Sequence, residues 1–268
     1  MPIVIGYWKI RGLAQPIRLL LEYHGLKYNE EVFECGPAPN YDRKMWLDKK
    51  SNIGLDFPNL PYYKDEDITL TQSEAILRYI AEKNNMGGAN PKERALLSMI
   101  NGAVNDLRWA FIRICYSPDF EKLKPEFMAS LPDKLKTFEE YLKTHFWISG
   151  NKLDYPDFNL YDLLDTLKAL ESSCLDAFPK LKDYVMKFEA SRNKTDVFLH
   201  NNRCFWKPVG FISNSHRSTF MITKCSIDQR YGTTLDTNFQ SRFHFLWVYY
   251  MILKENLGAA PLYLPVKS

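Results

Sequence analysis

The chain has 268 residues, of which 46% are hydrophobic and 25% charged, so it can form one or two globular domains with a substantial core. Its formal net charge of +3 is too small to favour nucleic acid or an anionic membrane surface as a partner. The five cysteines are far apart and lack a Cys-x-x-Cys pair, so neither a disulfide framework nor a metal site is predicted.

The first part of the chain predicts a strand, a helix and a second strand. Residues 3–8 are rich in β-forming side chains, apolar residues recur at helical spacing between 17 and 24, and residues 28–33 again favour a strand. Such a short strand–helix–strand order is typical of a βαβ unit with parallel strands.

A rigid loop at residues 54–63 organises this half of the chain. Pro58 and Pro61 fix φ and push the residues before them into extended geometry. Leu60–Pro61 is a candidate cis peptide bond. The backbone N–H and C=O of Leu60 are then expected to face outward, free to pair with an extended peptide.

A short strand at 68–71 and a helix at 73–83 follow, and Gln72-Ser73 opens the helix. Free amides at a helix start attract a carboxylate, so loop and helix start together describe a site for a small acidic peptide. A proline-rich turn before an ordinary helix is the plainer interpretation. The order of elements predicts a thioredoxin-like arrangement.

Beyond a linker at 84–90 the periodicity is helical. One long helix is predicted after Pro91, with an apolar stripe made of Leu96, Met99, Ile100, Ala103, Leu107, Phe111 and Ile114. Further helices are expected at about 125–143 and 156–171, the second opening on a carboxylate variant of the capping box at Asp154 and Asp157. The second domain is therefore expected to be an all-helical bundle.

Several segments resemble the cytosolic glutathione transferases: 6–13, 38–46, 54–61, 71–73, 115–125 and 174–182. The segment 38–46, with its Arg and Trp, is typical of the mu class. The resemblance implies a thioredoxin-like domain at 1–83 and an all-helical domain at 91–211. It also implies an enzyme that ionises the glutathione thiol and conjugates it to small hydrophobic electrophiles, as a homodimer that uses no cofactor because glutathione is a co-substrate. The cytoplasm is expected because the first residues lack the pattern of a signal peptide.

The resemblance assigns the catalytic position to Tyr7, although a tyrosine at a strand end is ordinarily a packing residue. A phenol that donates a hydrogen bond to sulfur would lower the thiol pKa from about 8.5. The implied glutathione-binding residues are Tyr7, Trp8, Leu13, Arg43, Trp46, Lys50, Asn59, Leu60, Gln72, Ser73 and Asp106. Leu60 would pair with the cysteinyl backbone, and Gln72 and Ser73 would hold the γ-glutamyl carboxylate.

Other implied roles concern the electrophile and the partner subunit. The electrophile pocket would be lined by Ile10, Leu13, Ile112, Tyr116 and Phe211. Arg43, Trp46 and Lys50 would clamp the glycyl end of glutathione. Asp106 would reach the γ-glutamyl ammonium of the other subunit, its plainer interpretation being a solvated helix face. Phe57 would insert between helices of that subunit as an aromatic key.

Two alternatives stay open. A non-catalytic relative would keep the fold for ligand storage, scaffolding or a lens-like structural role, and a glutathione-dependent prostaglandin isomerase would be a narrower enzyme. Intact Tyr7, Gln72 and Ser73 favour the transferase, and the segment 38–46 argues against the isomerase. Asn105 and Trp109 stand where the family commonly has Met, so the electrophile preference is open.

The tail at 212–268 lies outside the resemblance to the family, and it carries the excess positive charge of the chain. Its apolar run at 243–253 is shorter than the roughly 17–25 residues that span a bilayer. A genuine appendage, an interfacial anchor and a translated intron or alternative exon are the competing explanations. The third is favoured because composition shifts abruptly there, and we expect a poorly ordered tail that proteases cut readily.

Overall fold

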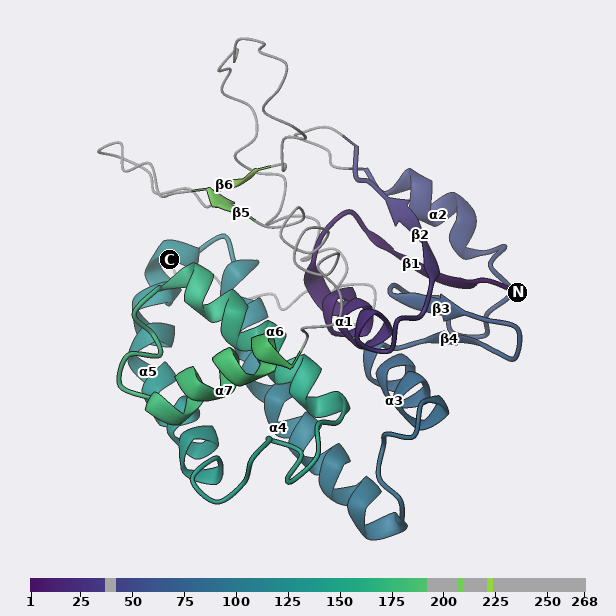
Figure 1. The fold of residues 1–268 in the computed structure, drawn as a ribbon. Helices are drawn as coiled ribbons and strands as arrows, with labels where there is room; N and C mark the ends of the chain where they lie inside the picture. Colours follow the sequence, from purple (N-terminus) through teal and green to yellow (C-terminus); the bar gives the residue numbers. More distant parts are fainter. Residues whose placement is uncertain (37–41, 192–206, 210–220, 224–268) are drawn as a thin grey trace, which may run out of the picture.

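The structure is a computed structural model that describes residues 1–36, 42–191, 207–209 and 221–223. A four-stranded sheet with flanking helices forms the first part of the chain, and a group of helices forms the next part (Figure 1). The predicted order, a thioredoxin-like domain followed by a helical domain, is confirmed.

The sheet is built around β1 (Ile3–Trp8), whose side chains are increasingly buried toward its end. β1 runs parallel to β2 (Tyr28–Phe33) and antiparallel to β3 (Tyr62–Lys64), which pairs with β4 (Thr69–Thr71). The strand order is β2-β1-β3-β4. Tyr7 thus lies near the end of a central strand, where it pairs with Val32 of β2, one residue beyond the last pair between β1 and β3.

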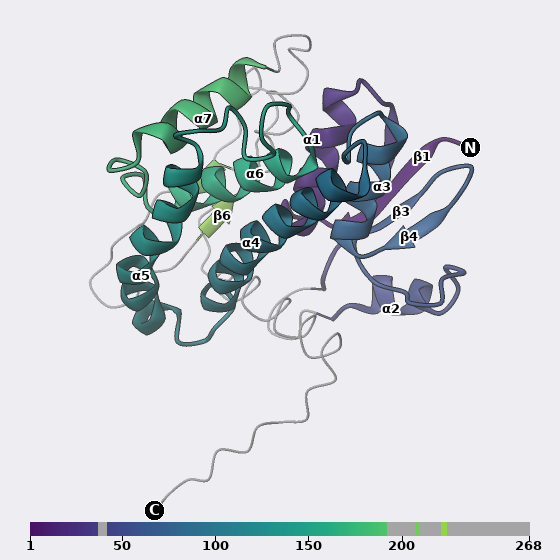
Figure 2. The ribbon, with the colours of Figure 1, turned by 90° about the horizontal axis from the view of Figure 1, so that it is seen from below.

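Three helices cover this sheet. α1 (Gln15–Tyr23) packs against α3 (Ser73–Lys83), and α2 (Lys44–Lys50) lies across the sheet from both of them in the two views (Figures 1 and 2). The bounds of β1, β2 and α3 are those that the sequence predicts, while β4 starts one residue later than expected. α2 was not predicted as a separate helix.

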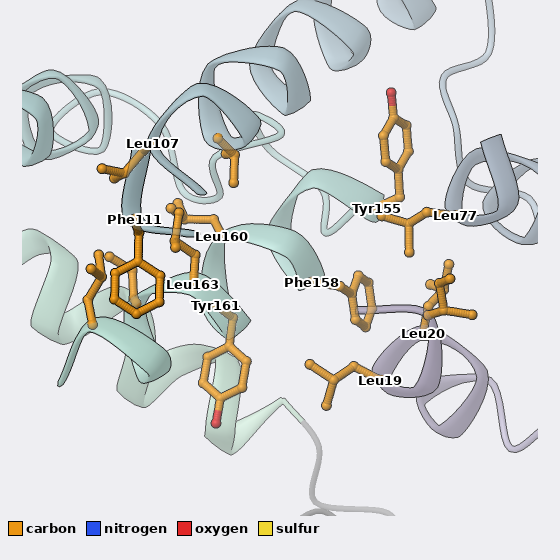
Figure 3. Packing of buried hydrophobic residues seen from close by; sticks show 14 of the residues in the cluster. Leu19, Leu20, Leu77, Leu107, Phe111, Tyr155, Phe158, Leu160, Tyr161 and Leu163 are labelled. Carbon is orange, nitrogen blue, oxygen red and sulfur yellow. The ribbon is translucent and has the colours of Figure 1, made fainter. Parts of the chain in front are cut away.

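The helical domain comprises α4 (Pro91–Cys115), α5 (Phe120–Tyr141), α6 (Tyr155–Leu170) and α7 (Pro179–Ala190). α6 packs against both α4 and α1, so it forms the centre of the contact between the domains. Phe158 of α6 points toward Leu20 of α1 in the close-up view (Figure 3). The predicted capping box is confirmed, because the Asp157 carboxylate accepts from Asp154 N–H at 3.0 Å while Asp154 caps the first turn.

Two helix predictions are corrected. The helix expected at 125–143 begins at Phe120, since Pro125 lies inside the helix rather than at its start. In α4, the predicted stripe merges two faces: Leu96 and Met99 are 45% and 63% exposed, and Ala103 is exposed as well. The face that packs into the core consists of Leu97, Ile100, Val104, Leu107, Phe111 and Ile114. α4 therefore carries a second, exposed apolar face.

Beyond α7, the described residues form two short antiparallel strands, β5 (Lys207–Val209) and β6 (Met221–Thr223), with Lys207 opposite Thr223. β5 lies within residues 91–211, which we expected to be entirely helical, so that expectation is wrong at Lys207–Val209. The apolar run at 243–253 and most of the predicted tail lie outside the described residues. No helix among the described residues is long and apolar enough to cross a bilayer.

Candidate active site

The hydroxyl group of Tyr7 is held by the backbone of the loop that follows β1. The side chain is 3% exposed, and its oxygen accepts a hydrogen bond from Leu13 N–H at 3.0 Å. Burial raises the pKa of Tyr7 to about 12, so the phenol keeps its proton at neutral pH. The hydrogen bond from Leu13 fixes the position of the Tyr7 oxygen, and the phenol retains its own proton. Tyr7 can therefore donate a hydrogen bond from a fixed position.

Gly12 makes this arrangement possible. Its φ is +42°, in the left-handed region where glycine carries no steric cost. A Cβ atom on Gly12 would lie 2.5 Å from the hydroxyl oxygen of Tyr7. The position therefore requires glycine both for its backbone angle and for its closeness to the phenol.

Arg18 of α1 holds the same loop from within the first domain. Its guanidinium donates to the carbonyl oxygen of Arg11 at 3.1 Å and to Glu30 Oε1 at 2.7 Å. Arg18 is 2% exposed, so its bond to the Arg11 carbonyl oxygen is shielded from water. The loop backbone before Gly12 is consequently fixed to both α1 and β2.

The predicted residues of the glycyl end lie on and around α2. Arg43 precedes its first residue, Trp46 lies within it, and Lys50 is its last residue. The rings of Trp46 and Trp8 both pack edge-on against Phe33, with centroids 5.2 and 6.4 Å away. Sheet and helix thus bring Trp8 and Trp46 to one aromatic cluster.

The proline loop has the predicted cis bond between Leu60 and Pro61. One expectation about it is wrong: the backbone N–H of Leu60 is not free, because it donates to the side-chain oxygen of Asn59 at 2.8 Å. The hydroxyl group of Thr71 donates to the carbonyl oxygen of Phe57 at 2.9 Å and ties the loop to β4. A peptide that pairs with Leu60 must displace the Asn59 side chain.

Gln72 stands before the first residue of α3 and is exposed, with φ at 69°. A left-handed backbone at a residue other than glycine costs roughly 1–3 kcal/mol, and such residues are concentrated at ligand sites.

A small cavity lies beside the start of α3. Ser73, Leu13 and Asn101 border this cavity, which has a volume of about 20 Å³ and lies between the domains. The side-chain nitrogen of Asn101 has no hydrogen-bond partner among the described residues, and the cavity has room for one water molecule.

Two tyrosines from different domains meet at this end of the sheet. Tyr116 follows the last residue of α4, and burial raises its pKa above the ordinary value, with a further contribution from the nearby Tyr7. Ile112, one turn earlier, is buried, and Ile10 is half-buried in the loop after β1. Phe211, the remaining residue of the predicted electrophile pocket, lies outside the described residues.

Two predicted site residues lie on the outer surface. Phe57 is 80% exposed at the tip of the proline loop, and Asp106 is exposed on α4. Both side chains are therefore accessible to another chain, and their roles on a second subunit stay predictions.

Comparisons with known proteins agree with this arrangement. The family model of the glutathione S-transferase N-terminal domain matches residues 3–82, and that of the C-terminal domain matches residues 104–192. Glutathione S-transferase Mu 1 of Bos taurus is 50% identical over 209 residues, which cover 78% of this chain and 95% of that protein. The chain belongs to the glutathione S-transferase family.

This transferase also resembles glutathione S-transferase B of Cavia porcellus, at 48% identity over 78% of this chain and 95% of the relative. The Pi-class glutathione S-transferase of Onchocerca volvulus has a similar structure, with a TM-score of 0.68, 31% identity, and coverage of 78% of this chain and 98% of that one. The predicted mu class is confirmed by Mu-class relatives at 44–50% identity. The roles of individual site residues stay predictions.

Sequence reasoning missed the residues that hold the Tyr7 loop. Arg11, Gly12 and Arg18 were given no role, although an Arg-Gly pair shortly after a strand is a usable signal for a tight loop. Asp162, which binds Arg11, was missed because nothing in the sequence pairs residues so far apart in the chain.

Proposed function

We propose that this transferase ionises the thiol of glutathione with Tyr7 and adds the thiolate to small hydrophobic electrophiles. The single observation that carries the proposal is the bond from Leu13 N–H to the Tyr7 oxygen, which fixes a protonated phenol at the end of a central strand. The chain's membership of the glutathione S-transferase family supports the substrate.

The chemistry requires preferential binding of the thiolate over the thiol. A thiol with a pKa of about 8.5 is only a few per cent ionised at neutral pH. Lowering that pKa by about two units takes roughly 2.7 kcal/mol, which a charge-assisted hydrogen bond supplies for the most part. A tyrosine with a raised pKa suits this role, because it donates a hydrogen bond to the sulfur and keeps its own proton, while the proton of the thiol is released to water.

The remainder of glutathione would lie along the elements described above. The γ-glutamyl carboxylate would sit at the start of α3, beside Gln72 and Ser73, where free amides point outward. The cysteinyl backbone would pair with Leu60 in exchange for the Asn59 side chain. At the other end, Arg43 and Lys50 would supply positive charge for the glycyl carboxylate.

The electrophile would bind on the side of the thiolate that faces the helical domain. Ile10 and Leu13 come from the segment after β1, Ile112 comes from α4, and Tyr116 directly follows α4. The raised pKa of Tyr116 keeps its hydroxyl group protonated, so it is a second donor, available to an oxyanion that forms on the electrophile.

A homodimer is part of the proposal. Phe57 is an exposed aromatic side chain at a loop tip, and Leu96 and Met99 form an exposed apolar face on α4. Exposed apolar groups of this size favour a partner surface, and two-fold pairing would cover both copies at once. Asp106, on the same helix, would then reach the γ-glutamyl ammonium of the partner's ligand.

We place the enzyme in the cytoplasm and assign it no cofactor, since glutathione serves as co-substrate. Retention on immobilised glutathione together with conjugation of a chloronitrobenzene tests the proposal. Retention without conjugation would instead favour a non-catalytic ligand-binding relative, and failure of both would reject glutathione as the ligand.

A further inference from the structure

Arg11 reaches from the first domain into the second. It lies in the loop between β1 and Gly12, and it is 8% exposed. Its Nε–H donates to Asp162 Oδ1 at 2.6 Å, and another guanidinium N–H donates to the Asp162 carbonyl oxygen at 3.3 Å. A third bond, 2.7 Å long, goes to the carboxylate of Asp165 one turn further along α6.

Asp162 is 1% exposed, and a second arginine shares its carboxylate. Arg108 of α4 donates to Asp162 Oδ2 at 2.7 Å. The other guanidinium nitrogens of Arg108 donate to the side-chain and main-chain oxygens of Asn159 at 2.9 and 2.7 Å. Asp162 is therefore held in place by α4 and α6 and presents one oxygen to the first domain.

Stability alone is a poor explanation for such a buried carboxylate between two arginines. Desolvation offsets most of the attraction within buried ion pairs, and apolar replacements of similar volume are often as stable. What such a cluster supplies is fixed geometry, because charged groups in a shielded site tolerate only a narrow range of positions.

The fixed geometry bears directly on Tyr7. Arg11 is followed by Gly12 and then by Leu13, whose N–H binds the Tyr7 oxygen. Arg18 holds the carbonyl oxygen of Arg11 from the other side. The position of the Leu13 amide relative to the Tyr7 hydroxyl group is thus set by one residue in each domain. Arg18 holds the loop in the first domain, and Asp162 holds it from the second.

We propose that Asp162 is a positioning residue for thiol activation: through Arg11 it holds the loop whose Leu13 amide orients the Tyr7 hydroxyl group. This inference rests on the proposed role of Tyr7 in ionising glutathione. It assigns part of the activation to the helical domain, through a residue that touches neither the sulfur nor the phenol.

Arg11→Lys distinguishes the effect of loop geometry from the effect of charge. The lysine keeps the positive charge and leaves the Asp162–Arg108 bond intact, but it lacks the planar guanidinium group that binds Asp162 at two points. The measured quantity is the pKa of the bound glutathione thiol, read from thiolate absorbance in the ultraviolet as a function of pH. We expect it to rise by about one unit, with a tenfold loss of thiolate well below that pKa. The dissociation constant of glutathione should change by less than about threefold, because the γ-glutamyl and glycyl contacts are untouched.

Asp162→Asn should raise the thiol pKa in the same direction. Asp165→Asn is the matched control: Asp165 is on the same helix and binds the same arginine, but its side chain is 37% exposed, and Arg108 pairs with Asp162 instead. Its thiol pKa should equal that of the wild type. Should Asp162→Asn fail to fold, Arg11→Lys against Asp165→Asn still decides the question.

A wild-type thiol pKa in a folded Arg11→Lys enzyme would overturn the inference while leaving the role of Tyr7 intact. Equal effects of Asp165→Asn and Arg11→Lys would also overturn it, since Asp162 would then hold no special place. A wild-type enzyme that leaves the glutathione thiol at its solution pKa would instead reject the proposed function, and the inference with it.

Discussion

The backbone N–H of Leu13 donates to the hydroxyl oxygen of Tyr7 at 3.0 Å, and the intervening Gly12 leaves no room between them for a side chain. The phenol is thereby oriented by main chain rather than by another side chain. Main-chain donors at a fixed loop are pre-organised, so the alignment of the phenol does not have to be established at the moment of reaction.

Gly12→Ala tests this relationship. The added methyl group would meet the Tyr7 oxygen at 2.5 Å on a backbone with φ of +42°, so the loop or the phenol must shift. We expect kcat/KM to fall by about 10-fold or more, as small misplacements in active sites commonly cause. Steady-state kinetics on the purified variant provide the measurement.

Gly25→Ala is the control for that variant. Gly25 also has a positive φ, +65°, but a Cβ there meets nothing within 4 Å. It should lose roughly 1 kcal/mol of stability from backbone strain and keep its activity. Equal activity losses in the two variants would show that strain, and not the contact with Tyr7, is responsible.

Asp65 predicts a pH-dependent contribution to stability. Burial alone would raise the pKa of its carboxyl group, but Lys83, the N–H groups of Asp67 and Ile68, and the Tyr63 hydroxyl outweigh burial and hold the pKa well below its ordinary value. A lowered folded-state pKa gives stability that is present above the unfolded pKa of about 3.9 and lost as pH falls through the folded pKa.

Asp65→Asn should therefore lower the unfolding free energy at pH 7 by about 2–3 kcal/mol, a cost typical of a broken buried charge network. The difference from the wild type should shrink as the pH falls below about 4. Urea unfolding at several pH values measures both effects. Asp67→Asn, which removes the exposed partner of Lys83, should cost less than about 1 kcal/mol, and an equal cost for both variants would contradict the assignment to Asp65.

Phe57→Ser tests the proposed dimer. Phe57 is 80% exposed in the single chain, so its loss should leave the fold intact while weakening the subunit contact. An interface anchor is worth about 2 kcal/mol or more, so the dimer dissociation constant should rise by about 30-fold or more in analytical ultracentrifugation. Phe146→Ser, at an aromatic residue that is 57% exposed beside Lys187, is the control and should leave the dimer unchanged.

Asp106→Asn tests the contribution of one subunit to the ligand of the other. We expect the dissociation constant of glutathione to rise by about tenfold, because a hydrogen bond to a charged group is worth about 1.5 kcal/mol or more. Isothermal titration provides the measurement. Asp133→Asn makes the same change of charge on the exposed face of α5, and an equal loss there would point to net charge instead.

The sequence predicted local features of the site well and contacts across the chain poorly. The strand ending at Trp8, the cis Leu60–Pro61 bond and the start of α3 at Ser73 follow from local residue preferences. The bond between Arg11 and Asp162 has no such signature, because it joins loops and helices that only the folded chain brings together.

Two errors have distinct physical causes. Leu96 and Met99 were assigned to the core because they share the helical period of the buried face, and the period alone does not separate two adjacent apolar faces. Leu60 N–H was expected to be free, but the neighbouring Asn59 has a side chain short enough to accept its hydrogen bond.

The central claim is that the fixed phenol of Tyr7 ionises bound glutathione. Its most direct test is the pH titration of thiolate absorbance for glutathione bound to the wild type and to Tyr7→Phe. We expect a thiol pKa of about 6.5 in the wild type and a return to about 8.5 in the variant, with turnover lower by about 10²-fold and little change in glutathione affinity. Equal thiol pKa values in the two proteins would contradict the claim.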